Sequence, residues 1–179
     1  LTLIPATPDL AGAEVELVGM VGREFRLRDA LAAEHTADHE FVFVDCPPSL
    51  GLLTLNALAA ADGLLVPIQA EYFAMEGVSN LMTTIDEVRR FLNPGLRIDG
   101  ILLTMYDERT NLATQVADEV RGVFGDLVYK TVVPRNVRLA EAPSFGRPIH
   151  AYDLRSRGSQ AYLELGREYL ERMEVSGDS

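Results

Sequence analysis

The stretch that decides the fold class reads Phe41-Val42-Phe43-Val44-Asp45-Cys46-Pro47-Pro48-Ser49. Four apolar residues end on a carboxylate, and two prolines then prevent continuation as strand or helix. A run of this kind predicts a strand buried on both faces, which is typical of a parallel sheet. Asp45 follows the carboxyl end of that strand, where α/β folds place ligand-binding groups. In nucleotide hydrolases, an acid at this position holds Mg²⁺ and water near the γ-phosphate.

The other half of such a site is absent from this sequence. Nucleotide hydrolases cradle the phosphates in a glycine-rich loop with a lysine, G-x-x-x-x-G-K-[ST]. The chain has one lysine, Lys130, and it lies in no such loop. The residues therefore show half of a nucleotide site.

Length and composition predict one α/β domain over residues 1–179, with a sizeable core. No apolar stretch reaches the length of a membrane span, and the opening residues lack the pattern of a signal peptide, so we expect a cytoplasmic protein. Because Cys46 is the only cysteine, an internal disulfide is excluded. The net charge of −11 weakly disfavours nucleic acid as a partner.

One segment of this acidic chain is basic. Residues 130–157 carry a balance of +4, from Lys130, Arg135, Arg138, Arg147, Arg155 and Arg157 against Glu141 and Asp153. Such a segment can bind an anion locally, although a solvated surface is the alternative explanation.

Hydrophobic spacing predicts an alternation of strands and helices. Strands are expected over residues 41–44, 64–68, 98–105 and 128–133, and helices over 10–18, 23–34, 52–61, 75–92, 113–124 and 159–173, with loop over 135–152. Asp9 is a candidate cap for the first helix. The last helix has an apolar stripe, expected to pack on the sheet: Tyr162, Leu163, Gly166, Tyr169, Leu170 and Met173. The alternation predicts a mostly parallel, doubly wound sheet with flanking helices.

Several segments together resemble the ParA/Soj family of chromosome and plasmid partitioning ATPases. They are residues 3–10, the Asp45 run with residues 55–58, residues 67–72 and 103–110, and the fourteen-residue block from Val133 to Gly146, which is the most specific. The resemblance covers essentially the whole chain and implies a P-loop NTPase fold of the deviant Walker A type. Members begin with K-G-G-x-G-K-[ST], which is not present here, so we expect the chain to correspond to the family's last two-thirds, truncated at its N-terminus.

The resemblance also implies roles for individual residues. Asp45 would position the magnesium shell, through water, and the attacking water. The strand end at Thr104 and Met105 and the loop Pro134-Arg135-Asn136 would surround the adenine. Arg109 and Arg138 would bind DNA without regard to sequence, with Arg147 and Arg135 as auxiliary contacts.

Structural explanations of the same residues stay open. Asp45 is also a residue type that begins turns. Met105 would be a core residue and Asn136 a turn residue in any α/β protein. Arg109 and Arg138 would be surface cations paired with carboxylates such as Glu108 or Glu141.

By resemblance, the intact protein would bind and hydrolyse ATP with Mg²⁺, dimerise, bind DNA nonspecifically on the nucleoid and respond to a ParB-type partner. Without the phosphate loop, this chain is expected to be inactive alone and to bind no cofactor tightly. The alternative is a non-enzymatic module of the same fold that acts by self-association, as a dimer or larger assembly with exchanged elements. A receiver-like or flavodoxin-like domain is disfavoured because it leaves the fourteen-residue block unexplained. The acidic last helix makes membrane binding unexpected.

Overall fold

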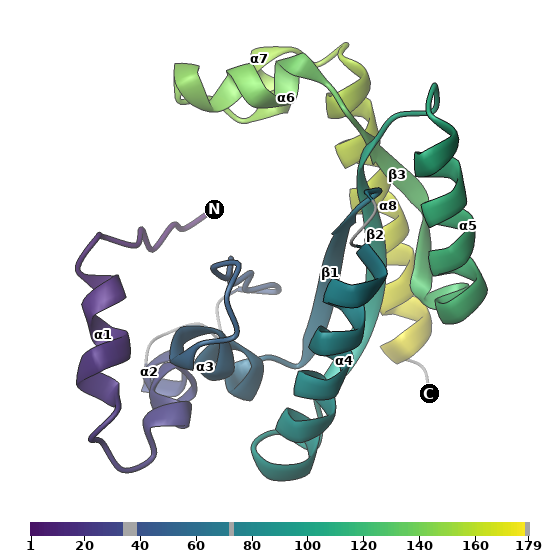
Figure 1. The fold of residues 1–179 in the computed structure, drawn as a ribbon. Helices are drawn as coiled ribbons and strands as arrows, with labels where there is room; N and C mark the ends of the chain where they lie inside the picture. Colours follow the sequence, from purple (N-terminus) through teal and green to yellow (C-terminus); the bar gives the residue numbers. More distant parts are fainter. Residues whose placement is uncertain (34–38, 72–73, 178–179) are drawn as a thin grey trace. The chain divides into compact units, whose positions relative to one another are not determined.

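The computed structural model describes residues 1–33, 39–71 and 74–177. Along the chain it contains α1 (Leu10–Leu17), η1 (Arg23–Phe25), α2 (Arg26–Ala33), α3 (Leu52–Ala60), β1 (Gly63–Gln69), α4 (Ala74–Phe91), β2 (Arg97–Tyr106), α5 (Asn111–Phe124), η3 (Gly125–Leu127), β3 (Val128–Pro134), α6 (Val137–Glu141), η4 (Ala142–Phe145), α7 (Ile149–Tyr152) and α8 (Arg157–Gly177) (Figure 1). The predicted helices and strands are confirmed within a few residues, apart from the differences given below. Glu34, the predicted end of the second helix, and Tyr72, in one of the family-like segments, lie outside the described residues.

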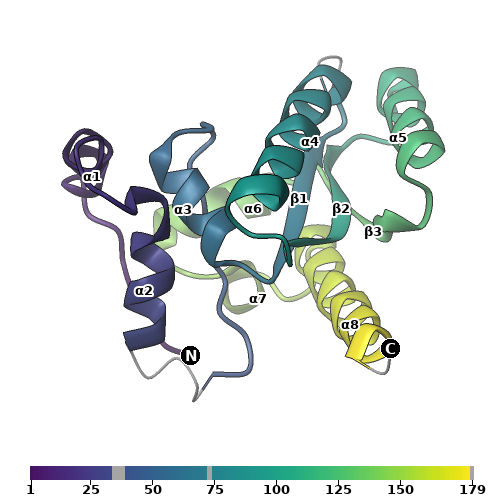
Figure 2. The ribbon, with the colours of Figure 1, turned by 90° about the horizontal axis from the view of Figure 1, so that it is seen from below.

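The described residues form two compact units. Unit 1 comprises Leu1–Gly63 and Leu81–Arg97, and unit 2 comprises Leu64–Asn80 and Ile98–Ser179. Unit 2 contains almost the whole sheet, whose strand order is β1-β2-β3. β2 and β3 pair in parallel, and α5 and α8 lie on opposite faces of this pair (Figures 1 and 2). This arrangement confirms the predicted α/β class.

The register between β2 and β3 explains how α8 is attached. Ile101 pairs with Val128 but Leu103 pairs with Val132, so β3 has extra residues in this interval. A bulge of this kind leaves backbone groups outside the ladder. The Glu168 carboxylate accepts the N–H groups of Lys130 at 2.8 Å and Thr131 at 2.9 Å. A side chain of α8 therefore satisfies the irregular part of the last strand in the sheet order.

Arg172 completes this attachment. Its guanidinium donates to the carbonyl oxygens of Leu127 and Val128, pairs with Glu168 at 3.0 Å and lies 4.0 Å from the centre of the Tyr129 ring. The apolar core beside it consists of Leu102, Tyr129, Val133 and Leu165. Polar pairing and apolar burial thus hold α8 on β3 together.

The predicted inward face of the last helix is only partly correct. Tyr162, Leu163 and Leu170 are exposed, whereas Ala161 and Leu165 are buried and Tyr169 packs against the apolar core. The buried face also includes Glu168 and Arg172, whose side chains are 15% and 23% exposed. Because charged residues occupy part of that face, a purely apolar stripe identified it only in part.

In unit 1, two asparagines join segments distant in sequence. Asn56 accepts the Leu27 N–H and donates to the Arg23 carbonyl oxygen, which attaches α3 to η1 and α2. Asn93 donates to the carbonyl oxygens of Leu58 and Ala61, at the carboxyl end of α3. These bonds satisfy helix-end groups that would otherwise lack partners.

Two predictions about the first sixty residues are wrong. Phe41–Val44 is not a strand of the β1-β2-β3 sheet, and its side chains are exposed, Phe43 by 72%. A strand forms only where a neighbour pairs with it, and hydrophobic spacing carries no information about that neighbour. Asp9 stands before α1, but its side chain makes no cap hydrogen bond.

The predicted loop over residues 135–152 contains three short helical segments. Asn136 caps α6 by accepting the Arg138 N–H, and Pro143 lies in the first turn of η4. Gly146 ends η4 with φ of +61°, a left-handed conformation that glycine adopts without steric cost. Local capping residues, rather than hydrophobic periodicity, therefore shape this segment.

Candidate functional site

Asp45 lies in unit 1, in irregular backbone before Pro47 and Pro48, and its side chain is exposed. An exposed carboxylate suits Mg²⁺, which commonly takes one or two carboxylates together with waters and substrate phosphates. The described residues hold no cluster of three or more potential ligands that would bind a metal alone. Asp45 therefore fits a magnesium site in which water and phosphate supply the remaining ligands.

The surroundings of Cys46, an exposed residue beside Asp45, disfavour its thiolate form. Desolvation raises the pKa of its thiol, and the Asp45 carboxylate raises it further. The reactive form of cysteine is the thiolate, so both effects lower its reactivity.

The carboxyl ends of the three strands meet at one edge of the sheet in unit 2. The Thr104 hydroxyl donates to the Ile68 carbonyl oxygen at 3.2 Å, and the Thr104 carbonyl oxygen accepts the Ala70 N–H. The Arg135 N–H donates to the Tyr106 carbonyl oxygen at 2.9 Å. Thr104 and Arg135 are thus held at adjacent strand ends, as the sequence predicted.

Met105 has an unusual backbone conformation at this edge. Its φ is +52°, the single positive value among non-glycine residues in the described ranges. Leu103 pairs with Val132 and Tyr106 with Pro134, so β2 carries an extra residue here. Bulges occur frequently beside functional sites, because they redirect a side chain, and Met105 is 39% exposed. The alternative that Met105 is an ordinary core residue does not agree with this exposure.

The loop after β3 is held by polar contacts. Asn136 uses its side-chain oxygen to cap α6, at 2.9 Å from the Arg138 nitrogen. Arg135 pairs with Glu71, which follows β1, at 3.2 Å. β2 lies between β1 and β3 in the sheet order, so this ion pair crosses the carboxyl end of β2.

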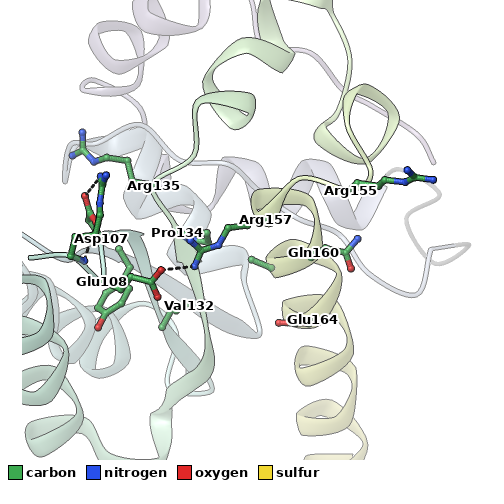
Figure 3. Close-up of a pocket in the computed structure, with 12 residues that line it drawn as sticks. Asp107, Glu108, Val132, Pro134, Arg135, Arg155, Arg157, Gln160 and Glu164 are labelled. Atoms are coloured by element: carbon green, nitrogen blue, oxygen red, sulfur yellow. Dashed lines mark hydrogen bonds and ion pairs between the residues drawn. The ribbon is translucent and has the colours of Figure 1, made fainter.

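A pocket of about 580 Å³ opens at this end of unit 2 (Figure 3). The loop after β2, the end of β3 and the first turns of α8 supply its lining, with Tyr106, Asp107, Glu108, Arg109, Val132, Pro134, Arg135, Arg155, Arg157, Gln160, Ala161 and Glu164. Four arginines and three carboxylates make it strongly polar. The pocket brings together Arg109, Pro134 and Arg135, whereas Thr104, Met105 and Asn136 are not part of its lining.

Arg109 and Asp107 form the tightest ion pair of this pocket. Arg109 donates from Nε and Nη2 to the two Asp107 oxygens at 2.8 and 2.7 Å, and its backbone N–H also contacts that carboxylate. These hydrogen bonds from Arg109 lower the pKa of the Asp107 carboxyl to about 2. The Arg109 side chain remains 82% exposed.

Arg138 and Arg147 lie outside the pocket, on the segment of short helices. Arg138 pairs with Glu141 at 2.9 Å and contacts Asp153 at 3.6 Å, and the Tyr152 hydroxyl donates to Glu141. Arg147 is exposed between η4 and α7. The expected pairing of Arg138 with Glu141 is therefore present, whereas Arg109 pairs with Asp107 rather than with Glu108.

Sequence reasoning assigned no role to four residues at this edge. Glu71 and Asp107 hold the candidate arginines, and Arg155 and Arg157 line the pocket. The excess of cations over residues 130–157 was the signal for Arg155 and Arg157. Nothing in the sequence indicated the pairing of Glu71 with Arg135, because they are 64 residues apart.

The sequence and the fold are similar to those of known proteins. A protein family described as an AAA domain matches residues 1–98. The chromosome partitioning protein ParA of Myxococcus xanthus is 60% identical over 172 residues, which are 96% of this chain and 60% of that protein. The sporulation initiation inhibitor protein Soj of Bacillus subtilis is 56% identical over 94% of this chain and 66% of its own length. The chromosome-partitioning ATPase Soj of Thermus thermophilus is 55% identical over 96% of this chain and 67% of its own length.

Solved structures agree on the fold. A cobyrinic acid a,c-diamide synthase from Mycobacterium smegmatis, solved with bound ADP and magnesium, is 37% identical with a TM-score of 0.77, over 96% of this chain and 62% of that one. McdA from Cyanothece has a TM-score of 0.77 at 15% identity, over 95% of this chain and 67% of that one, which shows a common fold alone. The chain spans about 60 to 67% of the curated relatives named above. From its sequence identity and its α/β fold, the chain belongs to the ParA/Soj family of chromosome partitioning proteins.

Proposed function

We propose that this protein acts in chromosome partitioning as a nucleotide-dependent protein of the ParA/Soj type. The observation that carries the proposal is the identity of 55 to 60% with proteins named ParA and Soj, over 94 to 96% of this chain.

Asp45 takes the role of magnesium-positioning acid in this proposal. Bound ATP with Mg²⁺ would supply the phosphoryl group and the metal. Asp45 would hold the metal through water and orient the attacking water. Its exposed carboxylate, followed by two prolines that restrict the backbone, supports this role.

The strand ends of unit 2 take the role of base-binding edge. Thr104 and Met105 lie near the carboxyl end of β2, Pro134 ends β3, and Arg135 and Asn136 follow it. Ligands bind at this edge in open α/β sheets. Exposed Met105 offers a polarisable surface to a base, while the backbone groups of Pro134 and Arg135 can read its edge.

The basic residues of unit 2 take the role of DNA contacts. Arg109, Arg138 and Arg147 are exposed cations on or near loops, which suits phosphate binding without base readout. The protein would act as a dimer on the nucleoid, in the cytoplasm, under the control of a ParB-type partner.

The experiment that tests this proposal is depletion of the protein in the cell that carries its gene. Cells without DNA, counted by fluorescence microscopy, are expected to become more frequent as the protein disappears. A cell population whose chromosomes segregate normally after complete depletion contradicts the proposal.

A second candidate function is self-association without catalysis, and one observation favours it. Residues 1–44 expose many large apolar side chains, and α1 buries none of its residues. Apolar surface on this scale commonly marks an interaction site. Light scattering is expected to show a dimer or a larger assembly, and a monomer at all concentrations contradicts this function.

A further inference from the structure

The pocket of unit 2 contains an ion pair that joins two distant parts of the chain. Arg157, at the start of α8, contacts the Glu108 carboxylate at 3.0 Å across 49 residues of sequence. Figure 3 shows this pair extending across the pocket, with Gln160 and Glu164 on the neighbouring turns of α8.

This pair is weak compared with the Arg109–Asp107 pair. Arg109 is held by two short contacts in the fork geometry that favours bidentate binding. Arg157 has one contact to Glu108, and the two side chains are 70% and 62% exposed. Exposed pairs of this type contribute little to stability, so another anion can replace the carboxylate at little cost.

A second cation beside the pair lacks a carboxylate partner. Arg155 also lines the pocket, and within the described ranges its guanidinium makes no ion pair. In Figure 3 its side chain points away from the Glu108–Arg157 pair, toward the outside of the pocket. Two arginines, one without an ion pair among the described residues and one weakly paired, therefore lie at the beginning of α8 and line the same pocket as Arg109.

We propose that Arg155 and Arg157 bind phosphates of a nucleic-acid backbone, and that Glu108 occupies the phosphate position on Arg157 when nucleic acid is absent. The inference rests on the proposed DNA-binding role and extends it to two residues beyond Arg109, Arg138 and Arg147. The pocket is open, and its arginines are exposed, which suits a continuous backbone better than an enclosed small anion. Phosphate contacts of this type carry no sequence information.

Glu108 then acts as an internal competitor. A phosphate that binds Arg157 must first displace this carboxylate. The competition lowers the affinity of the protein for the nucleic-acid backbone. Replacement of Glu108 by Gln removes the negative charge while keeping the size of the side chain. Glu108→Gln is therefore expected to tighten binding about two- to fivefold, which is the range set by an exposed ion pair.

The test follows the arginine side chains of the isotope-labelled chain by NMR, at low salt, during titration with a short DNA duplex of arbitrary sequence. Signals of the Arg155 and Arg157 Nε–H groups, assigned from the Arg155→Gln and Arg157→Gln variants, are expected to shift together as DNA is added. Arg167, an exposed arginine of α8 outside the pocket, is the matched control. The chemical shift of its Nε–H signal is expected to remain unchanged as DNA is added. NMR detects millimolar binding, so weak affinity does not hide the result.

Affinity measurements complete the test. The double variant of Arg155 and Arg157 is expected to reduce the slope of log affinity against log salt by about 1 to 2, because up to two phosphate contacts are lost. Arg167→Gln is expected to change neither affinity nor slope, and Glu171→Gln is the acidic control for Glu108→Gln.

Three results overturn the inference. If DNA shifts other signals but not those of Arg155 and Arg157, the DNA contact lies elsewhere on the protein. That result does not contradict the partitioning proposal. If no arginine signal shifts at the highest DNA concentration, the proposed phosphate site is contradicted. The depletion experiment tests the partitioning proposal independently. Inorganic phosphate that shifts both signals as strongly as DNA, at equal phosphate concentration, contradicts the assignment to a nucleic-acid backbone.

Discussion

The neighbouring residue Arg109 determines the pKa of the Asp107 carboxyl. Its carboxyl receives three hydrogen bonds from Arg109, which lower its pKa from 3.8 to about 2. The folded-state pKa is lowered, so the stabilisation is present above the pKa of the unfolded chain and is lost as pH falls from about 3.8 toward 2. The pair therefore persists throughout the physiological pH range.

The first prediction concerns this titration. The side-chain carbon signal of Asp107, followed by NMR, is expected to titrate near pH 2, and Arg109→Gln is expected to return the midpoint toward 3.8. Arg121→Gln is the control, because Arg121 does not contribute to the shift. A midpoint that is the same with and without Arg109 contradicts the pairing.

A glycine in β2 gives the second prediction, also at the scale of single residues. A Cβ at Gly100 would overlap the Tyr129 ring and lie 3.0 Å from the Leu127 carbonyl oxygen. Tyr129 is fully buried, so the ring cannot move aside freely. Gly100→Ala is expected to lower the free energy of unfolding by about 1 to 3 kcal/mol, the usual cost of overpacking.

Gly122 is the matched control for Gly100. It lies within α5, and a Cβ there meets no atom within 4 Å. Gly122→Ala is expected to raise the free energy of unfolding by up to about 1 kcal/mol, because alanine favours helix. Both values come from urea unfolding, and equal effects of the two substitutions contradict the packing described here.

Among the secondary-structure elements, α8 depends on Glu168. Burial alone would raise the pKa of this carboxyl, but hydrogen bonds from the Thr131 and Lys130 backbone and from Arg172 lower it below 4.5. The ionised form is therefore the one that satisfies the bulge in β3. Its contribution to stability is present above the pKa of the unfolded chain and is lost as pH falls through the folded-state pKa.

The third prediction is that Glu168→Gln lowers the free energy of unfolding by about 1 to 3 kcal/mol near neutral pH, since backbone N–H groups lose a charged acceptor. Glu171→Gln replaces an exposed residue of the same helix. It is expected to change the free energy of unfolding by no more than about 0.5 kcal/mol relative to wild type. The difference between wild type and Glu168→Gln is expected to shrink below pH 4.5. A difference that persists unchanged in acid argues against the role of the carboxylate.

Elements with strong local signals could be predicted from the sequence. The spacing of Val78, Ile85 and Val88 predicted α4, and these side chains are buried. Phe41–Val44 was predicted wrongly because strand pairing depends on residues far away in the chain. The inner face of α8 was predicted only in part, because Glu168 and Arg172 are half-buried by pairing with β3, which apolar periodicity does not record.

The candidate site shows the same division. Arg109, Pro134 and Arg135 could be placed at one edge because parallel strands end on the same side of a sheet. The carboxylates that hold these arginines, Glu71 and Asp107, required the three-dimensional contacts. The functional roles of all the candidate residues remain predictions: Asp45, Thr104, Met105, Arg109, Pro134, Arg135, Asn136, Arg138 and Arg147.

At the scale of the whole molecule, the described residues carry the exposed acid Asp45, proposed to position magnesium, and a polar edge at the strand ends of unit 2. Residues 1–179 contain no phosphate loop and one lysine, Lys130, which lies in β3. The amides and the lysine of that loop supply much of the charge stabilisation in phosphoryl transfer.

The fourth prediction is that the purified chain of residues 1–179 shows no magnesium-dependent ATP hydrolysis. Calorimetry with ADP and ATP is expected to show millimolar affinity or none, since phosphates make most contacts in such sites. The Asp45→Ala variant serves as background. Hydrolysis above that background, or submicromolar affinity for ATP or ADP, contradicts the expectation that nucleotide binding and hydrolysis require the phosphate loop.

The described helices add one finding on membranes: none of them is both long and apolar enough for a membrane crossing.

The proposed function requires that the protein partition chromosomes and that Asp45 be essential to this activity. The most direct measurement replaces the gene in its own cell with an Asp45→Ala version and counts cells without DNA, with Asp62→Ala as a matched control. Cells with Asp45→Ala are expected to lose chromosomes as often as cells without the protein. Cells with Asp62→Ala are expected to segregate their chromosomes normally. Normal segregation in Asp45→Ala cells, with the variant present at wild-type levels, would contradict the proposed function.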